Sequence, residues 1–298
     1  MTSTPSPRLR LFAGAALISL SPVWVKLVSV SPTTSGFYRV LIGGVALTLY
    51  LAVTRRRPQF SRRVWSLLAL AAAFFALDLW FWHRSIIYIG PGLSTLLANF
   101  QVFILMLVGI LFLGQKPAGA QLVAIPLALV GLGMIVGFDW QSLPGDYRLG
   151  VIFGLLTAIC YAGYLLTMRF SREAAAVDMP TREIAVVSLV SAALLGLSAL
   201  AEGQSLAVTS AADFGWLAAY GVLSHCLGYI LIVSSLPQVS TTEAGLALLL
   251  QPTLSFVWDI VFFARPMTTI ELAGAALAIG AIYLGSRKRS EQVEGSRE

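Results

Sequence analysis

Charged side chains are scarce in this chain: Asp, Glu, Lys and Arg make up 11% of its 298 residues, against about 25% in a typical soluble domain. Hydrophobic residues make up 57%, more than a soluble fold can cover with polar surface. The shortage of charge therefore argues against an ordinary soluble protein. It indicates a protein that lies in a lipid bilayer, whose interior needs no polar surface.

The alternation of apolar and polar residues that marks the strands of membrane barrels is also lacking. The apolar runs are continuous and about as long as the 20 residues that a membrane-spanning helix needs. Backbone groups in hydrocarbon must be satisfied inside helices or a closed barrel. We therefore expect an all-α integral membrane protein.

Cysteines and catalytic motifs are equally sparse. The chain has two cysteines, Cys160 and Cys226, both in apolar runs and without metal-ligand spacing, so we expect buried free thiols. The sequence contains no Walker-type glycine loop, no G-x-S-x-G, no H-E-x-x-H and no paired catalytic aspartates. Direct use of ATP and an enzyme activity are therefore not expected, nor is a cofactor or a metal.

Hydropathy divides the chain into ten candidate spans when it is averaged over a window of about 19 residues. We expect membrane helices at 9–29, 34–53, 65–87, 92–113, 119–138, 148–169, 184–201, 213–235, 242–263 and 268–286. Arg8 and Arg10 precede the first span as in a signal peptide, but the apolar run is too long and no A-x-A site follows. We therefore expect the first helix to be retained.

The basic residues divide unequally between the two ends of these spans. Four lie at one end: Lys26, Arg84, Arg148 and Arg265. Fifteen lie at the other end: Arg8, Arg10, Arg55, Arg56, Arg57, Arg62, Arg63, Lys116, Arg169, Arg172, Arg182, Arg287, Lys288, Arg289 and Arg297. Because cytoplasmic loops carry the excess of Lys and Arg, we expect both termini in the cytoplasm. The formal charge of +6 then needs no nucleic-acid partner.

An internal repeat relates the two halves of the chain. A shift of 150 residues sets Gln101 on Gln251, and a shift of 147 sets Asp78 on His225 and Trp82 on Tyr229. Five spans in each half is an odd number, so the halves must point in opposite directions across the membrane. We expect one integral membrane unit in which 1–138 and 139–298 form a five-plus-five inverted repeat around a central cavity.

Several strings in the chain resemble the drug/metabolite transporter (DMT) superfamily in its EamA-type branch. They are F-Y-R-V-L-I-G-G around Arg39, F-L-G-Q-K-P at 112–117, L-L-Q-P-T-L at 249–254 and the glycine-rich fifth and tenth spans. Gln115 stands where the family commonly has glutamate, and N-F-Q-V-F at 99–103 lacks the family's usual proline. With W-F-W-H at 80–83, N-F-Q is most similar to the YddG-type aromatic amino acid exporters.

Ionisable and aromatic residues inside the spans are the candidate site. Asp78 and Trp82 share one helix face, as do His225 and Tyr229, because residues four apart lie one above the other. Intramembrane charges usually face a cavity or a partner. We predict a substrate-binding cavity lined by Asp78, Trp82, His83, Asn99, Gln101, Tyr161, Tyr164, His225, Tyr229, Gln251 and Trp258.

Structural roles compete with this prediction at several positions. Asp78 is as well explained by a pair with Arg39 or Lys26, and His225 by the ordinary satisfied histidine of a core. His83 lines the vestibule or caps its helix, the resemblance favouring the first. The two matched glutamines are cavity amides or interhelical hydrogen-bonding groups.

The resemblance implies a secondary transporter that exports aromatic and other neutral amino acids or related metabolites across the bacterial inner membrane by alternating access. A multidrug or purine-type exporter of the same superfamily is the alternative, and a membrane scaffold or sensor is a more distant one. A proton-coupled mechanism needs a titrating group such as Asp78, whereas facilitated diffusion needs none. The expected partners are a small-molecule substrate and membrane lipid, with no nucleic acid, and the expected state is a monomer or weak dimer.

Overall fold

The secondary structure is helical throughout the part of the chain that the computed structural model describes, which is residues 6–54, 60–114, 116, 119–137, 141, 143–175, 180–239 and 241–286. The α-helices are α1 Pro7–Ser19, α2 Ser21–Leu27, α3 Pro32–Val53, α4 Arg62–Ile89, α5 Pro91–Ala98, α6 Gln101–Phe112, α7 Gly119–Val136, α8 Gly145–Ala174, α9 Pro180–Ala201, α10 Ala211–Ala219, α11 Gly228–Ser235, α12 Thr241–Phe263 and α13 Thr269–Ser286. A π-helix, η1, spans Tyr220–Leu227, and a 3₁₀ turn, η2, spans Leu236–Gln238.

Serine side chains begin several of these helices. Ser31 accepts a hydrogen bond from the Thr34 amide at 3.2 Å, and Ser61 accepts one from the Val64 amide at 3.3 Å. Such N-caps satisfy backbone donors that the first helical turn leaves free. Gly90 ends α4 with φ +84°, a conformation that glycine adopts without a Cβ penalty.

The expectation of an all-helical membrane fold is confirmed for the described residues. Eight helical segments, among them α4 and α8, are long and apolar enough to cross a membrane. The two at the C-terminal end of the described chain, Leu249–Phe263 and Thr269–Gly285, are shorter apolar helices. Cys160 and Cys226 are free and buried, as predicted. Of the basic residues counted for orientation, Arg55, Arg56, Arg57, Arg287, Lys288, Arg289 and Arg297 lie outside the described residues.

Three of the expected spans are interrupted. The first divides at Leu20 into α1 and α2, and the fourth divides at Asn99 and Phe100 into α5 and α6. The eighth combines α10, the π-helix η1 and α11. α12, in contrast, continues through Pro252. Breaks and π-turns in membrane helices are tolerated where the backbone lies within protein or at a cavity.

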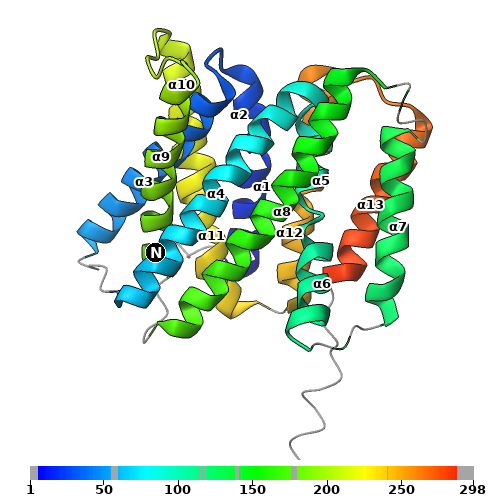
Figure 1. The fold of residues 1–298 in the computed structure, drawn as a ribbon, viewed down its shortest axis with the longest axis horizontal. Helices are drawn as coiled ribbons and strands as arrows, with labels where there is room; N and C mark the ends of the chain where they lie inside the picture. The colour runs from blue at the N-terminus through cyan, green and yellow to red at the C-terminus, as the bar shows by residue number, and fades with distance from the viewer. Residues whose placement is uncertain are drawn as a thin grey trace, which may run out of the picture.

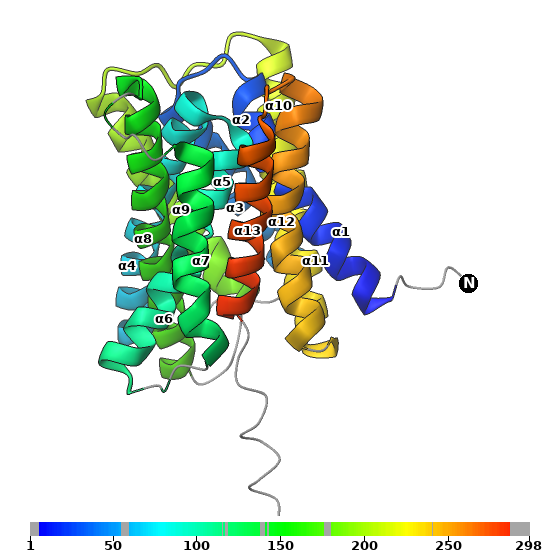
Figure 2. The same cartoon turned by 90° about the vertical axis from the view of Figure 1, so that its right-hand side faces the viewer.

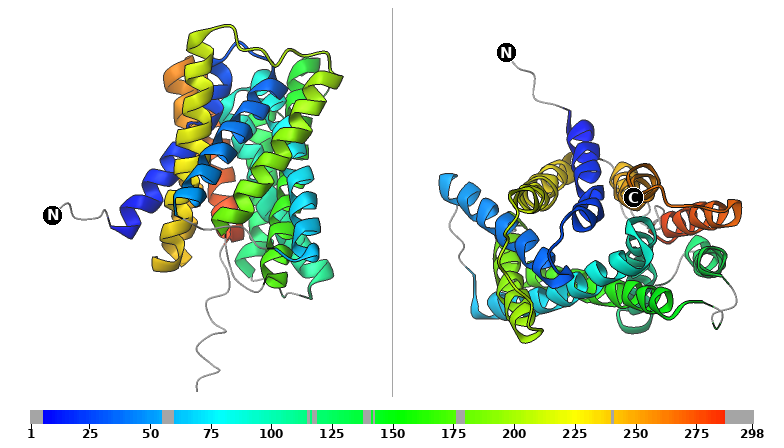
Figure 3. Two further views of the ribbon diagram at one scale, coloured as in Figure 1. Left: turned by 90° about the vertical axis from the view of Figure 1, so that its left-hand side faces the viewer. Right: turned by 90° about the horizontal axis from the view of Figure 1, so that it is seen from above.

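The helices pack in pairs around the centre of the molecule (Figures 1 and 2). α4 crosses α8, α3 lies along α9, α1 contacts α11, and α5 contacts α12. α7 and α13 form a pair on one side of the bundle, shown in Figure 2. Figure 3, in the view from above, shows the helices arranged as a ring of such pairs.

Glycines allow the backbones of α7 and α13 to come into direct contact. A Cβ atom on Gly274 would lie 2.7 Å from the carbonyl oxygen of Gly131, and one on Gly131 would lie 2.8 Å from the carbonyl oxygen of Gly274. Small residues hold membrane helices together in this way because close backbones gain van der Waals contact.

We expect Gly274→Ala to destabilise the protein by about 1–3 kcal/mol, the usual effect of forcing extra volume into a packed contact. Thermal unfolding of the detergent-solubilised protein, followed by tryptophan fluorescence, measures the loss as a lower Tm. Gly280→Ala on the same helix is the matched control, because a Cβ there meets no atom within 4 Å. Equal Tm values for the two variants would contradict close α7–α13 packing.

Glu202 closes one end of the bundle, called here the α4–α5 end. Its carboxylate accepts hydrogen bonds from Arg84 at 2.6 Å, Trp80 at 2.7 Å and Thr33 at 3.0 Å. The Arg84 guanidinium also lies over the Trp80 ring at 3.5 Å. These contacts join α3, α4 and the segment that follows α9.

Asp259 makes a second closure at the α4–α5 end. It accepts a hydrogen bond from the Gly92 amide at 3.0 Å and pairs with Arg265 at 3.3 Å. Arg265 in turn donates to the carbonyl of Ile89 at 3.0 Å. The two helices α4 and α5 are thereby fixed to α12 where they meet.

Candidate functional site

A cavity of about 590 Å³ lies inside the ring of helices. Its lining reaches the opposite end of the bundle, where α8 meets α9, through Arg169, Arg172, Pro180 and Pro237. Neither Glu202 nor Asp259 of the α4–α5 end belongs to the lining. The cavity therefore extends from the middle of the bundle to the α8–α9 end, and its size is that of small-molecule sites.

Nine of the eleven predicted site residues lie in the wall of this cavity. They are Asp78, Trp82, Asn99, Gln101, Tyr161, Tyr164, His225, Tyr229 and Gln251. The structure thus brings together both helix faces that the sequence pairs, Asp78 with Trp82 and His225 with Tyr229. His83 and Trp258 are not part of the wall.

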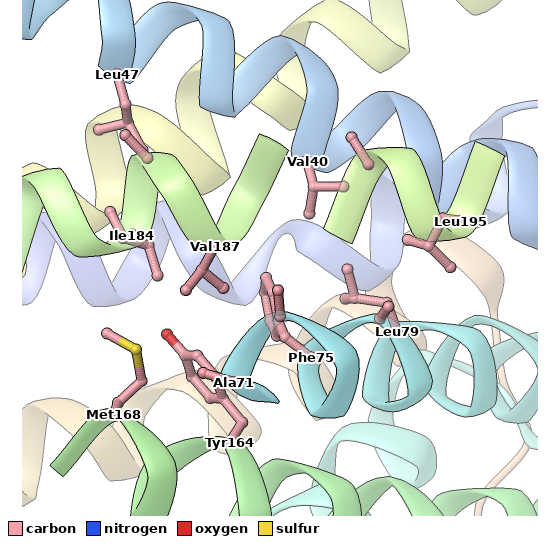
Figure 4. Packing of buried hydrophobic residues seen from close by; sticks show 14 of the residues in the cluster. Val40, Leu47, Ala71, Phe75, Leu79, Tyr164, Met168, Ile184, Val187 and Leu195 are labelled. Carbon is pink, nitrogen blue, oxygen red and sulfur yellow. The ribbon is translucent and has the colours of Figure 1, made fainter. Parts of the chain in front are cut away.

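Aromatic rings form a continuous stack along one side of the cavity. Phe75 of α4 stacks on Tyr164 of α8 at 4.9 Å between ring centroids, and on His225 of η1 at 6.0 Å. Tyr161 stacks on Tyr164 at 5.7 Å. Figure 4 shows Phe75 and Tyr164 facing each other among the buried side chains of α4, α8 and α9. This wall offers flat apolar surface to a ligand.

Two ionisable side chains of opposite sign lie in the same wall. Asp78 on α4 is only 6% exposed, and Arg39 on α3 lines the cavity with it. No ion pair joins Asp78 to Arg39 or to Lys26 among the described residues. Lys26 instead lies 4.9 Å over the ring of Phe263. The structural pairing considered for Asp78 is therefore not formed.

His225 is fixed from behind by α9. Its Nε2 atom lies 2.8 Å from the hydroxyl of Ser188, and that hydroxyl donates to the carbonyl of Ile184 at 2.6 Å. Because the serine proton is used, His225 Nε2 carries the proton in the Ser188 bond. Gly43 leaves the space for this ring, since a Cβ there would lie 2.9 Å from the Cβ of His225.

His83 lies behind the wall rather than in the cavity or vestibule. It is fully buried, with Nδ1 2.7 Å from the Leu79 carbonyl and Nε2 3.2 Å from the Tyr220 hydroxyl. The Tyr220 hydroxyl also accepts a hydrogen bond from Arg39 at 3.0 Å. Tyr220, a bulky residue of the π-helix η1, packs beside His83, and His83 does not reach the cavity.

The Trp258 side chain is hydrogen-bonded to the end of α1, next to the break in the first span. Its indole donates to the Ser19 hydroxyl at 2.9 Å, and Ser255 one turn earlier donates to the Ser19 carbonyl at 3.0 Å. Trp258 shares a helix face with Gln251, but α1 covers that face at the level of the tryptophan.

The break in the fourth span also supplies polar residues to the cavity lining, namely Asn99 and Gln101. Asn99 donates to the Thr95 carbonyl at 2.8 Å. With its amide nitrogen turned toward the break, Gln101 donates to the Asn99 carbonyl at 3.0 Å. The Thr95 carbonyl also accepts from the Asn99 amide at 3.2 Å, and the Asn99 carbonyl also accepts from the Val102 amide at 3.2 Å, so each side chain adds a second hydrogen bond to a carbonyl at the break. Gln251 also lines the cavity.

Sequence reasoning missed Arg39 and Phe75 as wall residues of their own. The sequence shows Arg39 as a family signature and a partner candidate for Asp78, whereas a single phenylalanine in an apolar run, such as Phe75, gives no signal of a cavity wall. Among the described residues, no group of three or more His, Cys, Asp or Glu side chains is placed to hold a metal ion.

The comparisons with known proteins agree with this architecture. The profile of the EamA-like transporter family matches residues 9–137 and again 148–287. The uncharacterized inner membrane transporter YhbE of Escherichia coli is 26% identical over 85% of this chain and 82% of its own. The pseudopaline exporter CntI of Pseudomonas aeruginosa is 24% identical over 85% of both chains. The uncharacterized transporter YwfM of Bacillus subtilis is 24% identical over 89% of this chain and 88% of its own.

A solved crystal structure has the same fold, with a TM-score of 0.67 over 95% of this chain and 99% of that chain at 16% identity. Matches to the family profile cover most of the sequence in two consecutive segments. The chain therefore belongs to the EamA-like transporter family of the drug/metabolite transporter superfamily, and it is a multi-pass membrane transporter.

Proposed function

We propose that the protein exports aromatic and other neutral amino acids, or related metabolites, by alternating access across the bacterial inner membrane. The observation that carries the proposal is the cavity, which combines a stacked aromatic wall with buried polar side chains. The nine predicted residues in its wall are proposed to contact the substrate. The similarity to YhbE, an inner membrane transporter, supports the proposed location, and the similarity to CntI, an exporter, supports the proposed direction.

The proposed machinery is a ten-helix inverted repeat, with residues 1–138 and 139–298 as its halves. The two family matches fall one in each half. Helix pairing supports it too: counterparts pack on each other in the pairs α3–α9, α5–α12 and α7–α13. The α4–α8 pair is mirrored by α11 with α1. Such exchange of partners is what a pseudo-twofold axis in the membrane plane requires.

The proposed orientation places both termini and the α8–α9 end in the cytoplasm, because the basic residues gather there. The cavity then opens to the cytoplasm while Glu202 and Asp259 close the far end. An exporter loads its substrate in this state. Export then requires the Arg84 and Arg265 contacts to part on the outer side while the α8–α9 end closes.

Uptake into proteoliposomes tests the proposal. Purified protein is reconstituted, and radiolabelled phenylalanine, tryptophan and threonine are followed with and without a pH gradient, with protein-free liposomes as the control. We expect saturable movement of phenylalanine and tryptophan. Dependence on the gradient would indicate proton coupling, and indifference to it would indicate a facilitator. Movement of a flat cationic drug or a purine, with none of any amino acid, would refute the proposal in favour of the drug or purine exporter.

A further inference from the structure

Asp78 and Arg39 both make fewer hydrogen bonds to the described residues than their side chains can form. The Asp78 carboxyl makes no hydrogen bond or ion pair within the described part of the chain. To the residues that the structure describes, Arg39 makes a single hydrogen bond, from Nη1 to the Tyr220 hydroxyl, and its buried Nε has no partner among them. Buried polar groups are rarely left in this condition without an external partner. Both face the same cavity, so one occupant can reach both.

The position of Arg39 is fixed by the structure around it. Its guanidinium carbon lies 5.4 Å from the centre of the Trp82 ring and 5.1 Å from that of Tyr220. Tyr220 donates to His83 Nε2, and His83 donates from Nδ1 to the Leu79 carbonyl, so the hydrogen bonds from Arg39 Nη1 through Tyr220 and His83 to Leu79 run in one consistent direction. Trp82 is one helical turn from Asp78 on α4. The network thus fixes the guanidinium over the ring of Trp82, in the same cavity wall as the Asp78 carboxyl, with no ion pair between the two among the described residues.

We propose that the cavity recognises its substrate as a zwitterion, with the substrate carboxylate on Arg39 and its ammonium on Asp78. This inference rests on the proposed function and names the feature that the site reads. A molecule with one charge would leave either Arg39 or Asp78 buried and unpaired, which is unfavourable. An α-amino acid carries both charges on one carbon atom and satisfies the two together.

The aromatic stack then receives the side chain of the substrate. Phe75 lies about one turn before Asp78 on α4, and its ring continues into Tyr164 and His225. An aromatic stack can accept many flat or apolar side chains. Two buried charges, in contrast, each require a substrate group of opposite charge in the right place. A substrate must therefore carry both the ammonium and the carboxylate, whereas its side chain can vary. His83 and Tyr220 are positioning residues for Arg39.

The first test uses three ligands of the same shape. Phenylalanine carries both charges, phenethylamine lacks the carboxylate, and 3-phenylpropionate lacks the ammonium. In the proteoliposome assay we expect phenylalanine to compete with radiolabelled phenylalanine at least tenfold better than either analogue, the ratio expected for one lost charge-assisted hydrogen bond.

The second test reverses this preference with two variants. Arg39→Gln is expected to raise the KM for phenylalanine about 10- to 100-fold and to make phenethylamine the better competitor. Asp78→Asn is expected to raise it similarly and to favour 3-phenylpropionate. A purely structural role for either residue would weaken all three ligands alike. Arg39→Lys, which keeps the charge, shows whether a loss in Arg39→Gln reflects misfolding, and size-exclusion profiles are compared for every variant.

The outcomes separate this inference from the proposed function. Phenylalanine transport in which the single-charge analogues compete equally well overturns the zwitterion assignment and leaves amino acid export intact. Variants that lose transport without the reciprocal shift in preference also overturn it. Absence of amino acid transport in the unaltered protein refutes the proposed function and the inference with it.

Discussion

Replacing Asp259 with alanine should lower the Tm of the protein by about 10 °C. Asp259 is 1% exposed, and it holds both the Gly92 amide and the Arg265 guanidinium, whose side chain is 14% exposed. Removing one partner of a buried pair leaves the other charge uncompensated, a loss of about 3–5 kcal/mol. For a chain of this length each kcal/mol lowers Tm by roughly 2–4 °C. Thermal unfolding in detergent by tryptophan fluorescence measures the effect.

Two further variants separate the charge from the hydrogen bond. Asp259→Asn keeps an oxygen that can accept from Gly92, so its Tm is expected between those of Asp259→Ala and the unaltered protein. Because Arg265 and Asp259 interact directly, the double alanine variant is expected to be more stable than the sum of the single losses predicts. Additive losses would show that the two side chains act independently.

Gly90 is needed for the contact of Asp259 with the α4–α5 junction, because of its conformation and its lack of a side chain rather than its hydropathy. Its φ of +84° already disfavours any side chain, and a Cβ there would lie 2.7 Å from Asp259 Oδ2. The carboxylate can approach the α4–α5 junction only because that junction is bare backbone. The sequence places Asp259 near the end of the ninth span, but it does not show that this carboxylate fixes the meeting point of the third and fourth spans.

The parts of the fold that the sequence predicts well are those set by hydropathy and helical phase. Long apolar runs predict the helices, since the bilayer leaves few alternatives. The advance of 100° per residue puts Asp78 with Trp82 on one face. That face does line the cavity, and so does the face bearing His225 and Tyr229.

The parts that could not be predicted depend on contacts between helices. The break at Asn99 and Phe100 contains no proline, so no residue type in the sequence marks the place where the fourth span divides into α5 and α6. The π-helix around His225 changes the local helical period without any change in hydropathy. Trp258 has the right phase but is covered by α1, which only the tertiary structure can show.

Phe75→Ala is expected to raise the KM for phenylalanine at least tenfold while changing that for threonine less than threefold. Phe75 is the ring that joins Tyr164 to His225, so its loss divides the aromatic wall. An aromatic pair contributes about 0.5–1.5 kcal/mol beyond the area it buries, and lost burial of a substrate ring adds to this. Threonine has no ring to stack and depends on the polar groups alone. Initial uptake rates at several concentrations in proteoliposomes give both KM values.

The matched control for that experiment is Phe103→Ala. Phe103 is 7% exposed and Phe75 is 6% exposed, so both truncations remove a similar buried ring and should destabilise the protein by about 3–5 kcal/mol. Phe103 lies against Gly285 and outside the cavity wall. A loss of transport shared by both variants for both substrates would therefore report lost folding. A selective loss of phenylalanine in Phe75→Ala alone locates recognition of the substrate ring in the stack, because only there does the removed ring face the cavity.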